Sequence, residues 1–279
     1  MNTQTFNSAI FDRALIKHTM HQIEALQKPP RKFNIHFQLD PYLETTPICG
    51  ESYQAWIDQT LPWTKELVAI EFHEDKTISY NANDDALGAL NFGPEMTVLK
   101  RTLPVGESLK CISEMDDGRT YYGFVNFDRP VGIPLLFNPN TGTPWMSLTP
   151  SEICTCRRGI ELASGRVLIG GLGLGWMVRE IARKPEVTEI VVVEKDPGVA
   201  TMIGELTVRD CLKPIQIIND DLWIYLTSTK EEFDYYSFDI WLKQSDSRHD
   251  SRCKKARKKL KGQEKTVWAW GDRLPLQKL

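Results

Sequence analysis

A glycine-rich loop with the sequence GGLGLG at 170–175 has the spacing of a loop that holds a nucleotide. It follows a short apolar run, so we expect it between a buried strand and a helix. At such a junction the backbone approaches a nucleotide closely, and glycine has no side chain in the way. Gly171, Gly173 and Gly175 fit the pattern G-x-G-x-G, whereas the dinucleotide pattern G-x-G-x-x-G needs a glycine where Trp176 stands. The spacing favours S-adenosylmethionine over NAD.

Two acids stand at positions where they could do chemistry with such a nucleotide. Glu194 ends the next apolar run, where a carboxylate can accept hydrogen bonds from both ribose hydroxyls and would repel a 2′-phosphate. Asp239 ends a later β-prone segment and could take or orient the proton of an amine or hydroxyl acceptor. Glycines that only allow tight packing, and a Glu194 that only ends a strand, would also explain each residue singly. Their order and register together favour the nucleotide.

These residues need a scaffold that gathers strand ends at one edge, and the second half of the chain predicts one. Thr149-Pro150-Ser151-Glu152 has the cap, proline and glutamate pattern that opens a helix. Apolar or β-prone runs then alternate with helical segments, which predicts an α/β fold with a doubly wound, mostly parallel Rossmann-like sheet. The expected strands are 166–169, 190–194, 215–218, 234–239 and 266–270.

The first half predicts a separate α+β domain without an obvious cofactor motif. Helical periodicity covers 6–26, and a weaker helix over 54–70 is interrupted at Pro62. Three β-prone pieces between 97 and 134 suggest a small antiparallel sheet. A cluster of turn residues at 138–144 marks the domain boundary, giving an N-terminal domain at 1–146 and a nucleotide-binding domain at 147–279.

From about residue 148 to 245 the chain resembles class I S-adenosylmethionine-dependent methyltransferases of the spermidine synthase-like subgroup. The segment from Val167 to Gly173 is similar to the first motif of that family, and the segment from Val192 to Pro197 to the second. Asn219-Asp220-Asp221 resembles the position after the third strand, and the segment from Phe233 to Asp239 resembles the fourth motif.

The resemblance implies a role for each of these positions. The glycine loop and Glu194 would bind the cofactor, with Glu194 on the ribose. Asp220 or Asp221 would bind the adenine amino group, and Asp239 would lie beside the methionine part or the acceptor. Methyl transfer asks for an acceptor held in line with the sulfonium and for exclusion of water, so no dedicated nucleophile is expected.

The sequence also departs from the family pattern. Ile169 stands where many methyltransferases carry an acid for the methionine amino group, and few residues remain after Trp270 for the usual last strands. Asp239 is followed by Ile240-Trp241 rather than by the Pro-Pro of base-amino methyltransferases. A methyltransferase with a small-molecule or protein acceptor is therefore the leading hypothesis. An aminopropyl transferase, although no acid cluster for a polyamine is evident, and a catalytically inactive binding protein are the alternatives.

Two clusters allow both a functional and a structural interpretation. Seven of the ten residues at 252–261 are basic, with a narrow apolar stripe at helical spacing, which predicts either a solvated helix face or a patch for nucleic acid. An aromatic wall near the nucleotide or ordinary core packing would explain the aromatic residues after the third strand and around the fourth. These are Trp223, Tyr225, Tyr235, Tyr236 and Trp241.

Composition limits the partners and the compartment. A net charge of −3 gives no overall field toward nucleic acid or membrane, so either partner would need a local patch. No run of 18 or more apolar residues is present and the first residues lack a signal-peptide pattern, so we expect a cytoplasmic protein without membrane contact. The close pair Cys154 and Cys156 has no histidine at ligand spacing. His18 and His21, three apart in the expected helix, could chelate a metal but favour an exposed polar face, so no metal is expected. The oligomeric state is left open, a homodimer included.

Overall fold

The computed structural model describes residues 50–67, 69–72, 78–80, 90–91, 96–107, 109–114, 120–138, 143–209, 211–242 and 244–272. The chain divides into two compact units whose main boundary falls within one helix, between Cys154 and Thr155, and residues 114–119 are also assigned to the second unit. The helix predicted over 6–26 lies outside the described residues. None of the described helices combines the length and the apolar character needed to cross a bilayer.

The first unit is built mainly from short strands with one helix against them. Its helix α2 and the 3-10 helix η1 correspond to the weak helix interrupted at Pro62 that the sequence predicts. The elements are α2 (Gly50–Thr60), η1 (Pro62–Glu66), β1 (Ala69–Phe72), β2 (Ile78–Tyr80), β3 (Leu90–Asn91), β4 (Thr97–Leu103), β5 (Leu109–Glu114), β6 (Thr120–Val125), β7 (Val131–Asn138) and β8 (Thr143–Ser147).

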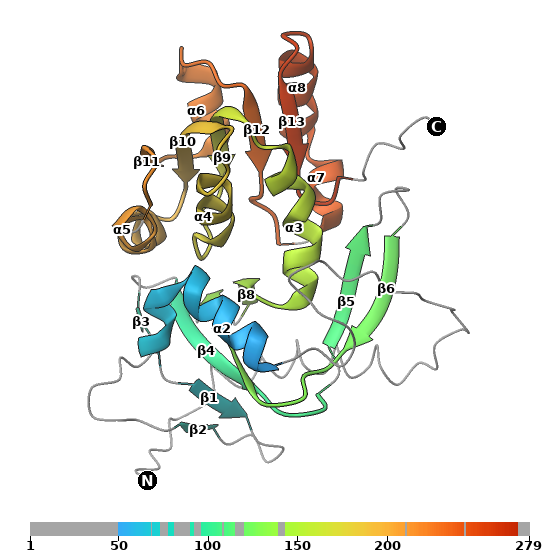
Figure 1. Ribbon diagram of the computed structural model, residues 1–279. Helices are drawn as coiled ribbons and strands as arrows, with labels where there is room; N and C mark the ends of the chain where they lie inside the picture. Colours follow the sequence, from blue (N-terminus) through green and yellow to red (C-terminus); the bar gives the residue numbers. More distant parts are fainter. Residues whose placement is uncertain are drawn as a thin grey trace. The chain divides into compact units, whose positions relative to one another are not determined.

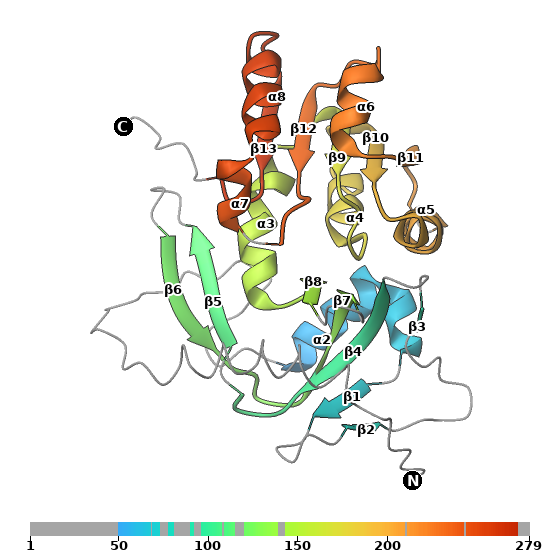
Figure 2. The same cartoon turned by 180° about the vertical axis from the view of Figure 1, so that it is seen from behind.

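The main sheet of this unit is larger than the sequence suggests. Its strand order is β2-β1-β4-β7-β8, with β3 paired to β4, while β5 and β6 form a separate two-stranded sheet (Figure 2). The pair β1–β4 is parallel, so the sheet is mixed rather than antiparallel. The turn residues at 138–144 join β7 to β8, which pair antiparallel, and the boundary predicted after residue 146 falls within β8. Local β-propensity located β4, β5 and β6, but it did not locate β7 and β8, and it does not specify which strands pair.

The second unit consists of alternating strands and helices, and the strands lie at the predicted places (Figure 1). Helix α3, which opens at Pro150, leads into it. The elements are α3 (Pro150–Leu162), β9 (Gly165–Gly170), α4 (Trp176–Ala182), β10 (Val187–Glu194), the π-helix η2 (Val199–Ile203), α5 (Gly204–Arg209), β11 (Ile215–Asn219), α6 (Leu222–Ser228), β12 (Tyr235–Phe238), α7 (Gln244–His249), α8 (Ser251–Lys261) and β13 (Thr266–Ala269).

These five strands form a parallel sheet in the order β11-β10-β9-β12-β13, which is a doubly wound, Rossmann-like α/β arrangement. The first strand, β9, lies in the centre, and successive strands are added first on one side of it and then on the other. The direction of winding therefore reverses between β9 and β12. In open parallel sheets ligands bind outside the carboxyl ends of the strands at this reversal.

The two faces of the sheet are covered by different helices. Leu168 on β9 and Tyr236 on β12 share a register position and pack into a core with Leu222 of α6 and Leu260 of α8. On the other face the hydroxyl of Tyr235 donates to the backbone oxygen of Gly159 in α3 at 2.6 Å. The apolar stripe of the basic helix α8 is therefore part of the core, and only the charged sides of α8 remain outside it.

Candidate functional site

The residues that the sequence singled out lie at the carboxyl edge of the parallel sheet. The glycine loop follows β9, Glu194 ends β10, Asp220 follows β11, and Asp239 follows β12. These are four neighbouring strands in the sheet order. The fold therefore places groups from four separate parts of the chain along one edge of the sheet, on both sides of the point where the winding direction reverses.

The glycine loop needs glycine for the packing of the chain itself. Gly171 has a φ of 92°, and a Cβ atom added there would lie 2.2 Å from the backbone oxygen of Asp239. Gly175 has a φ of 78°, and its added Cβ atom would lie 2.1 Å from the Thr207 hydroxyl. Both positions therefore leave no room for a side chain, and the loop backbone packs closely against Asp239 and Thr207. Gly173, with a φ of 54°, lies between them.

Glu194 holds this loop in place. One carboxylate oxygen accepts the backbone N–H of Leu172 at 2.8 Å, and the other accepts that of Asp196 at 2.8 Å. Only 7 % of the residue is exposed. Burial raises the pKa of Glu194, while the backbone donors act in the opposite direction. The sequence did not reveal this bracing role, because the contact of Glu194 with Leu172 depends on the pairing of β9 with β10.

Asp220 and Asp221 differ in how their side chains are used. Asp221 caps α6 by accepting the N–H of Trp223 at 2.9 Å, and it forms an ion pair with Lys195 at 3.2 Å. Burial acts to raise the pKa of Asp221, but the hydrogen bonds from Lys195 and Trp223 outweigh it and lower the pKa. Asp220 is partly exposed and accepts the N–H of Asp221 at 2.7 Å. Of the two, Asp220 has its carboxylate less committed to the fold.

Asp239 meets a partner that the sequence did not suggest. Its carboxylate lies 3.8 Å from the thiol of Cys156, which is fully buried on α3. The backbone N–H of Asp239 donates to Gly170 at 2.9 Å, so the residue is fixed beside the glycine loop. Burial raises the pKa of Asp239 to about 7, and the hydrogen bond from Cys156 acts in the opposite direction. A carboxyl group with this pKa can exchange a proton near neutral pH.

The aromatic residues divide between the two interpretations. Tyr225, Tyr235 and Tyr236 are buried in the sheet core, as ordinary packing predicts. Trp223 and Trp241 are partly exposed, and their rings lie 6.4 Å apart. Among the described residues, the three tyrosines thus form no wall around a ligand at the carboxyl edge of the sheet.

Comparisons with known proteins give a limited result. No protein-family model and no curated protein matches the chain. A solved spermidine synthase in complex with the transition state analogue AdoDATO is 15 % identical, with a TM-score of 0.29 over 56 % of this chain and 51 % of that one. Spermidine synthase from Thermotoga maritima is 15 % identical, with a TM-score of 0.29 over 49 % and 55 %. MNMC2 from Aquifex aeolicus is 16 % identical, with a TM-score of 0.28 over 51 % and 54 %.

The chain thus spans about half the length of these solved structures. The Rossmann-like class of the second unit rests on its own strand order and parallel pairing.

Proposed function

We propose that the second unit binds S-adenosylmethionine, or a close nucleoside relative, at the carboxyl edge of its sheet and transfers a group from it. One observation carries this proposal. Glu194 binds the glycine loop beside the reversal of the winding, and the carboxylates of Asp220 and Asp239 follow β11 and β12, the strands on either side of the pair β10–β9. This is the place where doubly wound sheets bind nucleotides.

The side chains at this edge suit the donors of an adenosyl group. Ribose hydroxyls and the adenine amino group donate hydrogen bonds, and carboxylates only accept them. Each oxygen of Glu194 accepts one backbone N–H and can accept a second hydrogen bond, so bracing the loop is compatible with binding ribose. Asp220 supplies a partly exposed carboxylate on the next strand for the adenine amino group.

When bound, the sulfonium supplies an activated alkyl group on a leaving group that becomes neutral on transfer. The chain then has to position the acceptor and to manage its proton. Asp239 is suited to the second task, because its carboxyl group titrates near neutral pH and is anchored through Gly170. It would accept the proton of an amine or hydroxyl acceptor as the new bond forms.

Methyl transfer to a small molecule or a protein is the reaction we favour. Aminopropyl transfer is the second candidate, since its amine nucleophile must also lose a proton and Asp239 would serve it equally well. The two reactions use different cofactors, so binding measurements separate them.

Isothermal titration of the full chain with S-adenosylmethionine, S-adenosylhomocysteine, decarboxylated S-adenosylmethionine and NAD tests the proposal. We expect the first two ligands to bind and NAD not to bind. A preference for the decarboxylated form would instead favour aminopropyl transfer.

The variant Asp220→Asn sharpens this test, because asparagine retains the oxygen that accepts the N–H of Asp221. We expect it to weaken cofactor binding about tenfold or more, as for the loss of a charged hydrogen bond worth roughly 1.5–3 kcal/mol. Asp234→Asn is the matched control. Asp234 also accepts a backbone N–H, from Arg166 at 2.8 Å, but it lies at the amino end of β12. Equal loss in both variants, or no binding by the wild type, would contradict the site.

A further inference from the structure

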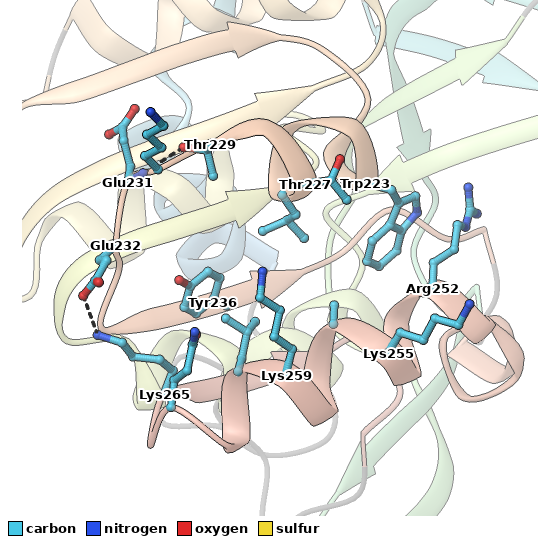
Figure 3. A pocket seen from close by; sticks show the side chains of 15 residues that line it. Trp223, Thr227, Thr229, Glu231, Glu232, Tyr236, Arg252, Lys255, Lys259 and Lys265 are labelled. Atoms are coloured by element: carbon cyan, nitrogen blue, oxygen red, sulfur yellow. Dashed lines mark hydrogen bonds and ion pairs between the residues drawn. The ribbon is translucent and has the colours of Figure 1, made fainter.

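A groove of about 620 Å³ lies between α6 and α8, on the face of the sheet that these two helices cover (Figure 3). One wall is the charged side of α8, with Lys255 and Lys259 one helical turn apart. The floor is apolar and includes Trp223 and Tyr236. The groove adjoins the carboxyl edge at Trp223, whose N–H Asp221 accepts, but none of the proposed cofactor-binding residues lines it, so its use does not depend on the proposed cofactor.

Positive charge in this groove is largely uncompensated. Within the described parts of the chain, Lys230, Lys255 and Lys259 have no ion-pair partner, and all three are exposed. Arg252 is bound to Asp250 at 3.0 Å and lies over the Trp223 ring at 5.3 Å from its centroid. Free ammonium groups in a row along a concave surface attract an anionic ligand.

A membrane surface is a poor fit for this helix. Interfacial helices insert an apolar face among the lipids. The apolar stripe of α8 is already used, because Cys253 and Leu260 are 1 % and 6 % exposed within the sheet core. What remains is a hollow lined by charge, and a flat bilayer cannot enter a hollow between two helices.

One end of the groove carries two carboxylates. Glu231 and Glu232 follow α6 and line this end, where in Figure 3 the Glu231 carboxylate points away from α8 and that of Glu232 points toward Lys265. Glu231 is bound to Arg166 and to the Tyr225 hydroxyl, while Glu232 is highly exposed and only 3.8 Å from Lys265. Because both carboxylates lie beside cations, they do not separate one polyanion from another, but an inorganic polyphosphate would leave the apolar floor without a partner. The carboxylates can, however, accept the exocyclic amino groups of nucleic-acid bases.

We propose that the α6–α8 groove binds a single-stranded nucleic acid, with backbone phosphates against Lys255 and Lys259 and unpaired bases over the apolar floor. A single strand alternates phosphates with flat apolar bases, which matches a wall of lysines beside a floor of aromatic and aliphatic side chains. A duplex hides its bases and leaves the floor without a partner. Lys255 and Lys259 are about 6 Å apart along the helix axis, so they can contact successive phosphates.

Fluorescence anisotropy with a labelled single-stranded oligonucleotide of about ten nucleotides tests this proposal on the full chain. The test variant is Lys255→Glu/Lys259→Glu. The matched control is Lys254→Glu/Lys258→Glu, which makes the same change of charge at the same spacing on exposed residues of the same helix that do not line the groove. Thermal unfolding of all three proteins establishes that they are folded.

We expect the groove variant to bind about tenfold or more weakly than the wild type and the control to stay within about threefold. The logarithmic salt dependence should become shallower by about 1.4 in the groove variant, because two phosphate contacts are lost at about 0.7 each. Equal loss in both variants would overturn the groove as the site. So would equal affinity for the duplex form, displacement by poly-glutamate at equal charge, preferential binding to phosphatidylserine vesicles, or no binding by the wild type.

Discussion

The carboxyl edge of the parallel sheet and the α6–α8 groove both present charge, but they hold it in different ways. At the edge, Glu194 is buried and its two oxygens accept backbone N–H groups of the loops around it. In the groove, Lys255 and Lys259 are exposed and have no ion-pair partners within the described part of the chain. Buried charges are coupled to folding and to pH, whereas exposed ones are screened by salt. Changes at the edge should therefore alter stability, and changes in the groove should alter only binding.

Glu194→Ala should give the largest effect. It leaves the buried N–H of Leu172 and the partly buried N–H of Asp196 without their acceptor, and a buried N–H without a partner costs roughly 1–3 kcal/mol. We expect the free energy of unfolding to fall by about 3 kcal/mol, together with a loss of cofactor binding. Denaturant titration measures the first and calorimetry the second. Glu189→Ala on the same strand removes only a partly exposed ion pair with Arg166 and should cost about 1 kcal/mol or less. Equal losses of unfolding free energy in the two variants would contradict the contrast between a buried and an exposed carboxylate.

Gly171→Ala should be the next largest. The new methyl group would clash with the Asp239 backbone oxygen at 2.2 Å, and alanine is also strained at a φ of 92°. We expect a loss of about 2–3 kcal/mol in unfolding free energy. Gly106→Ala isolates the strain, because Gly106 has a φ of 78° but nothing within 4 Å of the added Cβ atom. It should cost about 1 kcal/mol. A Gly171 variant no worse than this control would argue against a close approach of Asp239.

Asp239→Asn should change how stability depends on pH. The pKa of Asp239 is about 7 in the folded chain, against an ordinary value of 3.8, so the folded state retains a proton that the unfolded state releases. Stability is therefore lost as pH rises from about 4 to about 7. Asparagine stands in for the protonated form at every pH. We expect the variant to match the wild type near pH 4 and to be more stable by about 1–2 kcal/mol near pH 8, a reduced figure because the residue is only partly buried.

Asp221→Asn should change the pH dependence of stability in the opposite direction from Asp239→Asn. The pKa of Asp221 is lowered, so its contribution to stability is present above its ordinary pKa and is lost as pH falls through the lowered one. The variant should be less stable than the wild type at neutral pH, and the difference should vanish in acid. Thermal unfolding across pH compares both variants. Shifts of the same sign would contradict the assigned environments.

The smallest effect on stability should come from the groove. Lys255→Glu/Lys259→Glu should change the free energy of unfolding by less than about 0.5 kcal/mol, because both side chains are exposed and unpaired. Chemical denaturation checks this. A large loss of stability would mean that the lysines are part of the fold rather than a binding surface.

Much of the second unit could be predicted because its signals are local. Apolar runs and the turn residues that bound them predict the strands and the glycine loop. They also predict that Glu194, Asp220 and Asp239 lie at strand ends. Parallel strands joined by helices then leave few arrangements open. The first unit was less accessible: β4 was expected, but its parallel partner β1 and its separation from β5 and β6 were not.

The sequence by itself determined which residues lie at the ends of strands. Apolar runs and the turn residues between them are local signals, because each is carried by consecutive positions in the chain. Only the tertiary structure decided what those residues touch. Cys156 meets Asp239 across 83 residues, and Glu194 reaches Leu172 across 22. The groove likewise exists only because the sheet core takes up the apolar stripe of α8 and turns Lys255 and Lys259 away from it. Such contacts depend on strand pairing and helix packing, and these arise from many weak interactions over the whole unit rather than from any short segment.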